Sequence, residues 1–318
     1  MSLPLVTVVG AGQVGATTAH LLALKGLADV VLIDIVEGLA QGKALDMTQA
    51  APIEGWRGSV RGSTDYEAMA GSRLVIVTAG LARKPGMSRE DLLAANAQIV
   101  GPIAERINAL APDALIIVVT NPLDVMVALT LARSGFERRR IMGMAGVLDS
   151  ARLRAFIAER LGVPPTDVQA MVLGSHGDLM IPITRSVTVK GKPVTAQLST
   201  SDLEQLFQRT RDGGAEIVKL LKQGSAFYAP ASGVVEMATA ILNDTHTTLP
   251  VCAWLEGEYG LRDVCIGVPA QLGAKGIERI VELDLSPQER QALTAAAGQV
   301  RESIKSLGLI PKGAARVP

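Results

Sequence analysis

The sequence Leu-Val-Thr-Val-Val-Gly-Ala-Gly-Gln-Val-Gly at residues 5–15 joins a continuous apolar run to a Gly-x-Gly-x-x-Gly pattern. The run is short, β-branched and apolar at consecutive positions, which is typical of a strand that is buried on both faces. Glycines at these spacings allow a tight turn, close approach of the backbone to a pyrophosphate, and close packing of a helix on the strand. This stretch therefore predicts a strand, a turn and a helix whose N-terminus can bind phosphate.

The alternation of buried strand and amphipathic helix continues through the first half of the chain. The apolar runs that predict strands are Leu5–Val9, Val30–Ile33, Leu74–Thr78 and Leu115–Thr120, and the helical segments between them are Val14–Lys25, Gly38–Gln49 and Arg89–Leu110. Repetition of strand, helix and strand predicts an α/β fold with a doubly wound parallel sheet and helices on both faces.

The second half has a different pattern, which predicts a mixed α+β domain. Its expected elements are a helix at Asp149–Leu161 ended by Gly162, a hairpin turning at Gly191, helices at Asp202–Leu221 and Ser232–Leu242, and a last helix capped by Ser286, Pro287 and Glu289. We place the boundary near residues 143–146, which gives a first domain at 1–145 and a second at 146–318.

Composition excludes several classes of function. The chain of 318 residues has 31 Lys+Arg and 31 Asp+Glu, so no overall charge attracts nucleic acid or an anionic membrane. Its two cysteines, Cys252 and Cys265, are predicted to be core residues, and with three histidines in all a metal site is not expected. The first apolar run lacks a preceding basic segment, and the longest apolar stretches are too short to span a bilayer. We expect a soluble, cytoplasmic protein that binds no metal.

An acidic residue strengthens the prediction of a dinucleotide site. Asp34 follows the second predicted strand and lies 19 residues beyond Gly15. A carboxylate there accepts hydrogen bonds from ribose hydroxyls and repels a 2′-phosphate, which favours NAD over NADP. The alternative ligand is S-adenosylmethionine, because methyltransferases also combine a glycine loop with an acidic strand end.

Of the three histidines, His176 is the candidate for chemistry. It lies in Leu-Gly-Ser-His-Gly-Asp at residues 173–178, where nearby glycines leave the imidazole uncovered. His20 falls within a predicted helix, and His246 falls in a polar turn. Oxidation of an alcohol by hydride transfer needs a base for the hydroxyl proton, and histidine is suited to that role near neutral pH.

Asp149 and Arg152 are candidates for the partners of this histidine. They lie three residues apart at the start of a predicted helix, and therefore on one face of it. A carboxylate would fix the imidazole tautomer, and a guanidinium would bind a substrate carboxylate. The alternative interpretation of the pair is an ordinary surface salt bridge.

The order and spacing of the glycine loop, Asp34, Thr-Asn-Pro at residues 120–122, Asp149 with Arg152, and His-Gly-Asp at residues 176–178 resemble the lactate/malate dehydrogenase family. The resemblance covers almost the whole chain and implies a Rossmann domain followed by a substrate domain. It implies that His176 is the proton acceptor paired with Asp149, and that Arg152 binds the carboxylate beside the hydroxyl carbon. It also implies a substrate contact by Asn121 and cofactor contacts by Gly10, Ala11, Gly12, Gln13, Val14, Gly15, Asp34, Asn96, Val119 and Asn121.

The segment at residues 80–89, Gly-Leu-Ala-Arg-Lys-Pro-Gly-Met-Ser-Arg, is similar to the mobile loop of this family. Arg89 matches the arginine that polarises the reacting carbonyl, and Arg83 matches the position that selects the substrate. Malate enzymes carry an arginine at that position and lactate enzymes a glutamine, because a guanidinium can bind the second carboxylate of malate. Met87 also follows the malate pattern.

The sequence thus predicts an NAD-dependent oxidation of (S)-malate to oxaloacetate by a homodimer or homotetramer. Lactate oxidation on the same scaffold, a methyltransferase and a non-catalytic NAD-binding protein are the alternatives. One departure from the family is Ser175, where malate enzymes of this type often have glycine, and it affects the expected placement of His176.

Overall fold

The computed structural model describes residues 3–82 and 86–309. The helices are α1 (Gln13–Leu24), α2 (Leu39–Glu54), α3 (Arg89–Leu110), α4 (Leu123–Ser134), α5 (Gly146–Leu161), α6 (Thr200–Leu221), α7 (Tyr228–Leu242) and α8 (Pro287–Ser306). The strands are β1 (Leu5–Val9), β2 (Asp29–Ile33), β3 (Val60–Ser63), β4 (Leu74–Val77), β5 (Leu115–Val118), β6 (Ile141–Gly143), β7 (Val168–Gln169), β8 (Val172–Gly174), β9 (Met180–Pro182), β10 (Thr188–Val189), β11 (Lys192–Pro193), β12 (Thr247–Glu256), β13 (Arg262–Gly273) and β14 (Gly276–Ile280).

One large sheet runs through both halves of the chain. Within the described residues it contains eleven strands in the order β3-β2-β1-β4-β5-β6-β12-β13-β8-β9, with β14 beside β13. The strands from β3 to β6 are parallel, and those from β12 onward pair antiparallel. The strand order reverses between β1 and β4, and ligands of such sheets bind at the carboxyl ends of the strands at that point. The predicted α/β class with a doubly wound parallel sheet is confirmed.

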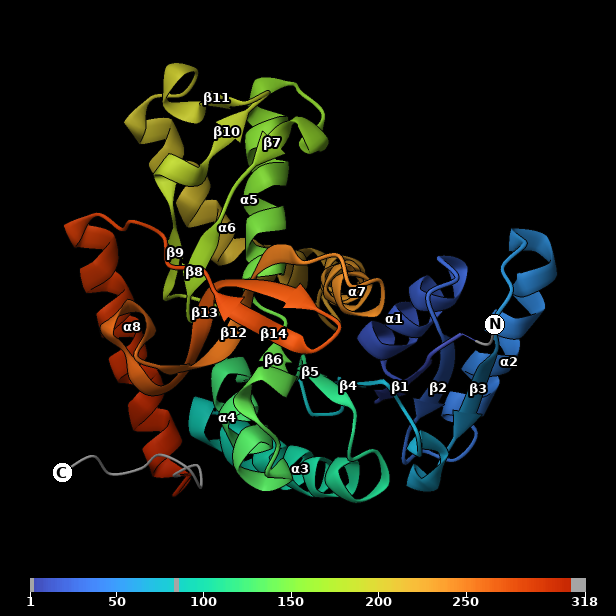
Figure 1. Cartoon of the computed structure of the whole chain (residues 1–318). Helices are drawn as coiled ribbons and strands as arrows, with labels where there is room; N and C mark the ends of the chain where they lie inside the picture. Colours follow the sequence, from blue (N-terminus) through green and yellow to red (C-terminus); the bar gives the residue numbers. More distant parts are fainter. Residues whose placement is uncertain (1–2, 83–85, 310–318) are drawn as a thin grey trace.

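Helices cover the parallel part of the sheet as expected. α1 packs against α7, and α3 packs against α4. Figure 1 shows these two pairs on either side of the strands β1 to β5. None of the helices in the described part of the chain is both long enough and apolar enough to cross a membrane.

Two hydrophobic cores lie within the described residues. The larger core combines the parallel strands with β12, β13, α7 and α8. The smaller core is formed by α5, α6 and residues of the short strands β7 to β10, with Leu153, Ile157 and Leu206 among its members. Figure 1 shows this second group standing above the main body. The segment from α7 to α8 therefore packs against the first predicted domain, although the sequence analysis placed it in the second.

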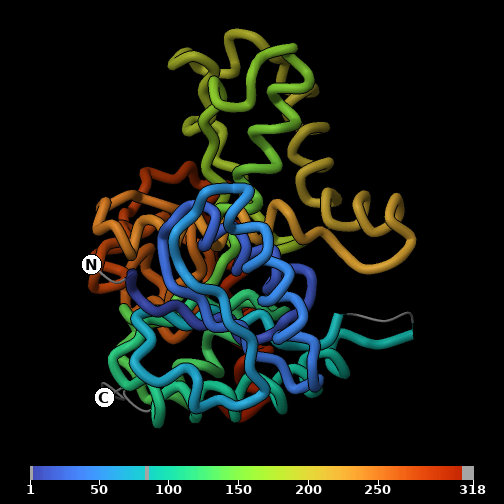
Figure 2. Tube along the Cα trace, turned by 90° about the vertical axis from the view of Figure 1, so that its right-hand side faces the viewer, coloured from blue at the N-terminus to red at the C-terminus, as the bar shows by residue number. Residues whose placement is uncertain are grey.

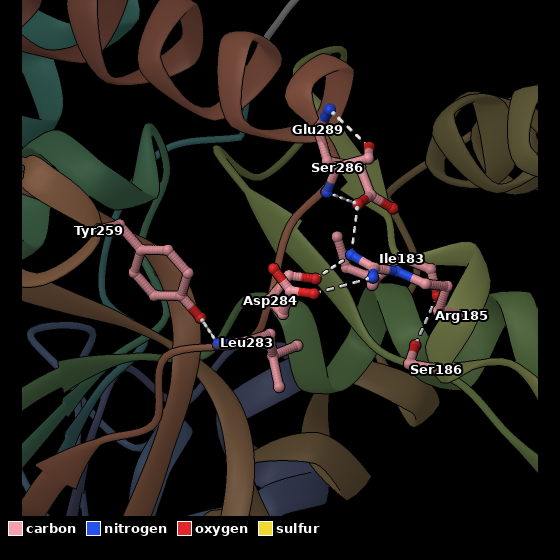
Figure 3. Close-up of polar contacts among 8 residues, drawn as sticks. All are labelled: Ile183, Arg185, Ser186, Tyr259, Leu283, Asp284, Ser286 and Glu289. Carbon is pink, nitrogen blue, oxygen red and sulfur yellow. Dashed lines mark hydrogen bonds and ion pairs between the residues drawn. The ribbon is translucent and has the colours of Figure 1, made fainter.

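The predicted start of the last helix is confirmed. The Ser286 hydroxyl accepts the Glu289 amide at 3.2 Å, and the Glu289 carboxylate accepts the Ser286 amide at 2.8 Å, which satisfies two unpaired donors of the helix terminus. Arg185 donates to Asp284 just before this cap, at 3.1 Å from its carboxylate. Figure 3 shows how these contacts fasten the beginning of α8 to the segment after β9.

Candidate active site

The glycine loop between β1 and α1 is shaped by its lack of side chains. Gly10 has a φ of +108°, and a Cβ there would lie 2.7 Å from the amide nitrogen of Ala79. A Cβ on Gly15 would lie 1.8 Å from the carbonyl oxygen of Gly10. At Gly12 nothing lies within 4 Å of that position, so the loop is open toward solvent there. The loop is therefore closed on the sheet side and open where a phosphate would approach.

Asp34 holds the loop from the end of β2. Its Oδ2 atom accepts the amide of Ala11 at 2.6 Å, and its Oδ1 atom accepts the amide of Val36 at 3.0 Å. The Lys43 ammonium on α2 donates to the carbonyl of Ala11 at 2.7 Å. Because each carboxylate oxygen has two lone pairs, Asp34 retains acceptor capacity for a hydroxyl group.

A cavity of about 540 Å³ lies over the glycine loop. Its lining residues are Gly12, Gln13, Val14, Gly15 and Thr78 on one side and Leu221, Gln223, Gly224, Ser225 and Phe227 on the other. The second set comes from the end of α6 and the segment before α7. A cavity of this size falls in the range of small-molecule and cofactor sites.

Asn96 organises the ends of two strands beside this cavity. It is fully buried on α3, and its amide nitrogen donates to the carbonyl of Asn121 at 2.6 Å. Its Oδ1 atom accepts the amide of Leu81 at 2.7 Å. Val119 is partly buried, and Asn121 is exposed just beyond β5. The hydrogen bonds of Asn96 therefore hold in place the residues that are predicted to contact the cofactor.

His176 and Asp149 meet between the two cores. His176 Nδ1 lies 2.9 Å from Asp149 Oδ2, and the side chains are 19% and 2% exposed. The attraction of the Asp149 carboxylate raises the pKa of His176 above its ordinary value, against the opposing effect of burial. Because Nδ1 faces a carboxylate, we assign the proton to Nδ1, which leaves Nε2 as the free proton acceptor.

Arg152 lies one turn beyond Asp149 on α5 and has unused hydrogen-bonding capacity. Its side chain is 13% exposed, and its Nη1 atom is 3.5 Å from Asp149 Oδ1. Its Nε atom is buried and has no partner within the described residues. Burial lowers the pKa of Arg152, although Asp149 opposes this effect. Gly213 leaves the space in which the arginine side chain lies. A buried guanidinium with a single long contact is suited to binding an anion.

The predicted mobile loop is only partly described. Arg83 lies outside the described residues, and Figure 2 shows the segments on either side extending away from the main body. Arg89 begins α3, and its Nη2 atom lies 2.6 Å from Asp178 Oδ2, with both side chains 73% exposed. The structure therefore brings Arg89 to the loop that carries His176, where its guanidinium is held by Asp178.

One residue near His176 was missed by the sequence analysis. Asp124, in the first turn of α4, is 4% exposed and accepts a hydrogen bond from the Ser175 hydroxyl. The available signal was a carboxylate two residues after Asn-Pro at a strand end. It was overlooked because an acidic residue in the first turn of a helix needs no ligand to explain it.

Comparisons with known proteins match both halves of the chain. Residues 5–143 match the family model for the lactate/malate dehydrogenase NAD-binding domain, and residues 146–308 match the model for the alpha/beta C-terminal domain of that family. A malate dehydrogenase from Nostoc punctiforme is 55% identical over 304 residues, which cover 96% of this chain and 93% of that protein.

Solved structures are also similar over nearly the whole length. A malate dehydrogenase from Cryptosporidium parvum has a TM-score of 0.94 and 42% identity, covering 97% of this chain and all of the other. A lactate dehydrogenase from Cryptosporidium parvum, solved with lactic acid and nicotinamide adenine dinucleotide, has a TM-score of 0.93 and 40% identity, covering 98% of this chain and all of the other.

Proposed function

The chain belongs to the lactate/malate dehydrogenase family, and we propose that it catalyses the reversible NAD-dependent oxidation of (S)-malate to oxaloacetate. The structural observation that carries the proposal is the meeting of His176, Asp149 and Arg152 at one point between the two cores. Family membership favours an oxidoreductase over the methyltransferase and non-catalytic alternatives. Those alternatives would also leave His176, Asp149 and Arg152 without a role.

The described residues fit NAD. The glycine loop is open at Gly12, Asp34 retains acceptor capacity at the end of β2, and the cavity over the loop has a suitable size. The amides at the start of α1 would bind the pyrophosphate, and Asp34 would bind the ribose hydroxyls of the adenosine. When bound, NAD supplies the acceptor for the hydride that leaves the substrate carbon.

His176 would take the hydroxyl proton during oxidation. Its Nδ1 proton is directed at Asp149, so Nε2 is available to the substrate, and Asp149 stabilises the imidazolium that forms. The reverse reaction begins with the protonated imidazole and returns the proton to the carbonyl oxygen. The raised pKa of His176 fits a group that must be stable in both forms near neutral pH.

The arginines would hold the two carboxylates. The Nε donor of Arg152 has no partner within the described residues, and the guanidinium would bind the carboxylate next to the hydroxyl carbon. Arg83 would bind the second carboxylate, a role that rests on the sequence. Arg89 would turn from Asp178 to the carbonyl oxygen as the loop closes. An exposed ion pair such as Arg89–Asp178 contributes about 1 kcal/mol or less to stability, so Arg89 can leave Asp178 for the substrate at little free-energy cost.

We also propose a homodimer or homotetramer in the cytoplasm. The exposed side chains of Leu45 and Ile53 lie on α2 and offer apolar surface that a second copy could cover. Cys252 and Cys265 are both buried and free, which fits a reducing compartment. Sedimentation at micromolar concentration tests the assembly, and a monomer throughout would contradict it.

Turnover of the purified chain tests the proposed reaction. Oxaloacetate should oxidise NADH, observed as a loss of absorbance, and H176N should lower kcat by a factor of about 100 to 10,000. The affinity for NADH, measured by fluorescence titration, should remain close to that of the wild type because His176 lies away from the glycine loop. A variant with near-normal turnover would show that another group accepts the proton.

A further inference from the structure

Asp124 is an unexpected acidic group behind the catalytic histidine. It lies on α4 in the larger core, whereas Asp149 lies on α5. Its side chain is buried, and its Oδ2 atom accepts the Ser175 hydroxyl. Its Oδ1 atom has no hydrogen-bond partner within the described residues. A buried carboxyl group that is only partly satisfied is costly, so its presence needs a reason.

The groups that face Asp124 come from the turn after β8 and from β12. Burial raises the pKa of Asp124, while the Ser175 hydroxyl, the Cys252 thiol on β12 and His176, through both its ring and its backbone amide, act to lower it. His176 itself is faced by Asp149 and Arg152 of α5 and by Asp124 of α4. Asp149 has the largest effect on the pKa of His176, Asp124 also raises it, and Arg152 lowers it.

The backbone around His176 needs an external support. Residues 175–179 lie between β8 and β9, beyond the last ladder pair, Gly174 with Met180. Gly174 and Gly177 have φ values of +90° and +114°, and nothing lies within 4 Å of a Cβ placed on Gly177. A turn with these two glycines does not fix the imidazole by its own stiffness. Ser175, which lies inside the turn, is bonded to a rigid helix through Asp124.

We propose that Asp124 is a positioning residue for His176: it ties the turn at residues 174–177 to α4 through Ser175 and places a second carboxylate behind the proton acceptor. This inference rests on the proposed role of His176. The tie is made by the Ser175 hydroxyl, a donor that a glycine or an alanine at this position would lack. His176 is thus held by Asp149 at its ring, and Asp124 holds the side chain of the preceding residue, Ser175.

The charge of Asp124 and its tie to Ser175 can be tested separately. D124N keeps the size of the side chain and its carbonyl acceptor but removes the charge. S175A removes the tie, and S175T restores a hydroxyl. T130A is a matched control, because Thr130 is another buried polar residue of α4, and its hydroxyl donates to the Met126 carbonyl of its own helix at 2.8 Å.

The first experiment titrates the histidine imidazoles of the full chain by NMR. His20 and His246 serve as internal references, and the His176 signal is identified by its loss in H176N. In D124N the His176 titration should move to lower pH, because an attraction for the imidazolium is lost, and T130A should leave it in place. A D124N titration that coincides with the wild type overturns the proposal.

The second experiment measures turnover and remains informative if D124N does not fold. S175A should lower kcat about five- to tenfold, the change that corresponds to the net contribution of one ordinary hydrogen bond, because Ser175 acts on His176 without touching the substrate; the NADH affinity should be unchanged. S175T should recover most of that loss. Wild-type kcat in S175A, or no recovery in S175T, overturns the proposal.

The two proposals fail in different ways. The NMR titration reads the surroundings of His176 without turnover, so it remains valid if oxaloacetate does not oxidise NADH with the wild-type chain. That lack of turnover would contradict the proposed function alone. A normal turnover with an unmoved titration in D124N would contradict the role of Asp124 alone.

Discussion

His176 Nδ1 and Asp149 Oδ2 lie 2.9 Å apart, joining a turn after β8 to the helix α5. The carboxylate is almost completely buried, so water screens the interaction little. Arg152 approaches the other oxygen of the same carboxylate. One buried acid thus orients a base and a cation whose free atoms can face a common substrate.

Replacing Asp149 should change the pH dependence as well as the rate. Because Asp149 is the main cause of the raised pKa of His176, D149N should lower that pKa. Malate oxidation needs neutral His176, so its acid limb should move to lower pH. Oxaloacetate reduction needs protonated His176, so its alkaline limb should also move to lower pH. Rate profiles in both directions check this, and limbs that stay in place would contradict the pairing.

Replacing Asp34 should weaken the preference for NAD. D34S removes the charge that repels a 2′-phosphate and the acceptor for the ribose hydroxyls. Hydrogen bonds to a charged group contribute about 1.5–3 kcal/mol, so the ratio of kcat/KM for NAD over NADP should fall roughly ten- to a hundredfold. Steady-state kinetics with both cofactors measure the ratio. An unchanged ratio would mean that Asp34 only anchors Ala11.

Replacing Arg152 should lower kcat/KM for the substrate and leave the affinity for the cofactor unchanged. R152Q loses the buried guanidinium, and kcat/KM for oxaloacetate should fall about a hundredfold or more, since a charge-assisted pair in a closed site is lost. R209Q is the control, because Arg209 is a partly exposed arginine on α6 that binds Glu159 and Glu216. It should change kcat/KM less than about fivefold. Equal effects of the two variants on kcat/KM would show that Arg152 does not bind the substrate.

Replacing Arg83 should alter the choice of substrate. R83Q removes the cation expected to bind the second carboxylate, so kcat/KM for oxaloacetate should fall and that for pyruvate should rise. The ratio of kcat/KM for oxaloacetate over that for pyruvate should fall by about a hundredfold, or fall below one. The paired measurement on one enzyme preparation provides its own control for folding. Unaltered selectivity would place the discriminating residue elsewhere.

Local patterns were sufficient to predict the parts of the fold that depend on neighbours in sequence. The bounds of α3 agree with the prediction at both ends, and the capping box of Ser286 and Glu289 is present. The helix α4 was not predicted, because most of its residues are buried and it lacks a polar face to reveal its period. The short strands β3 and β6 were missed as well, since a few residues carry little pattern.

The long-range arrangement of these elements was harder to predict from the sequence. The sequence predicted two domains, but it did not indicate that β12 and β13 extend the first sheet and share its core. In the site, the residue types of His176, Asp149 and Arg152 indicated a role, whereas the Asp124–Ser175 and Arg89–Asp178 contacts depend on segments brought together only by folding.

The most direct measurement of the central claim compares kcat/KM for oxaloacetate and pyruvate with the wild-type chain and saturating NADH. The account predicts a preference for oxaloacetate of at least about a hundredfold, because pyruvate leaves a guanidinium in the closed site without its anion. Equal values, or a preference for pyruvate, would contradict the assignment of malate as the substrate.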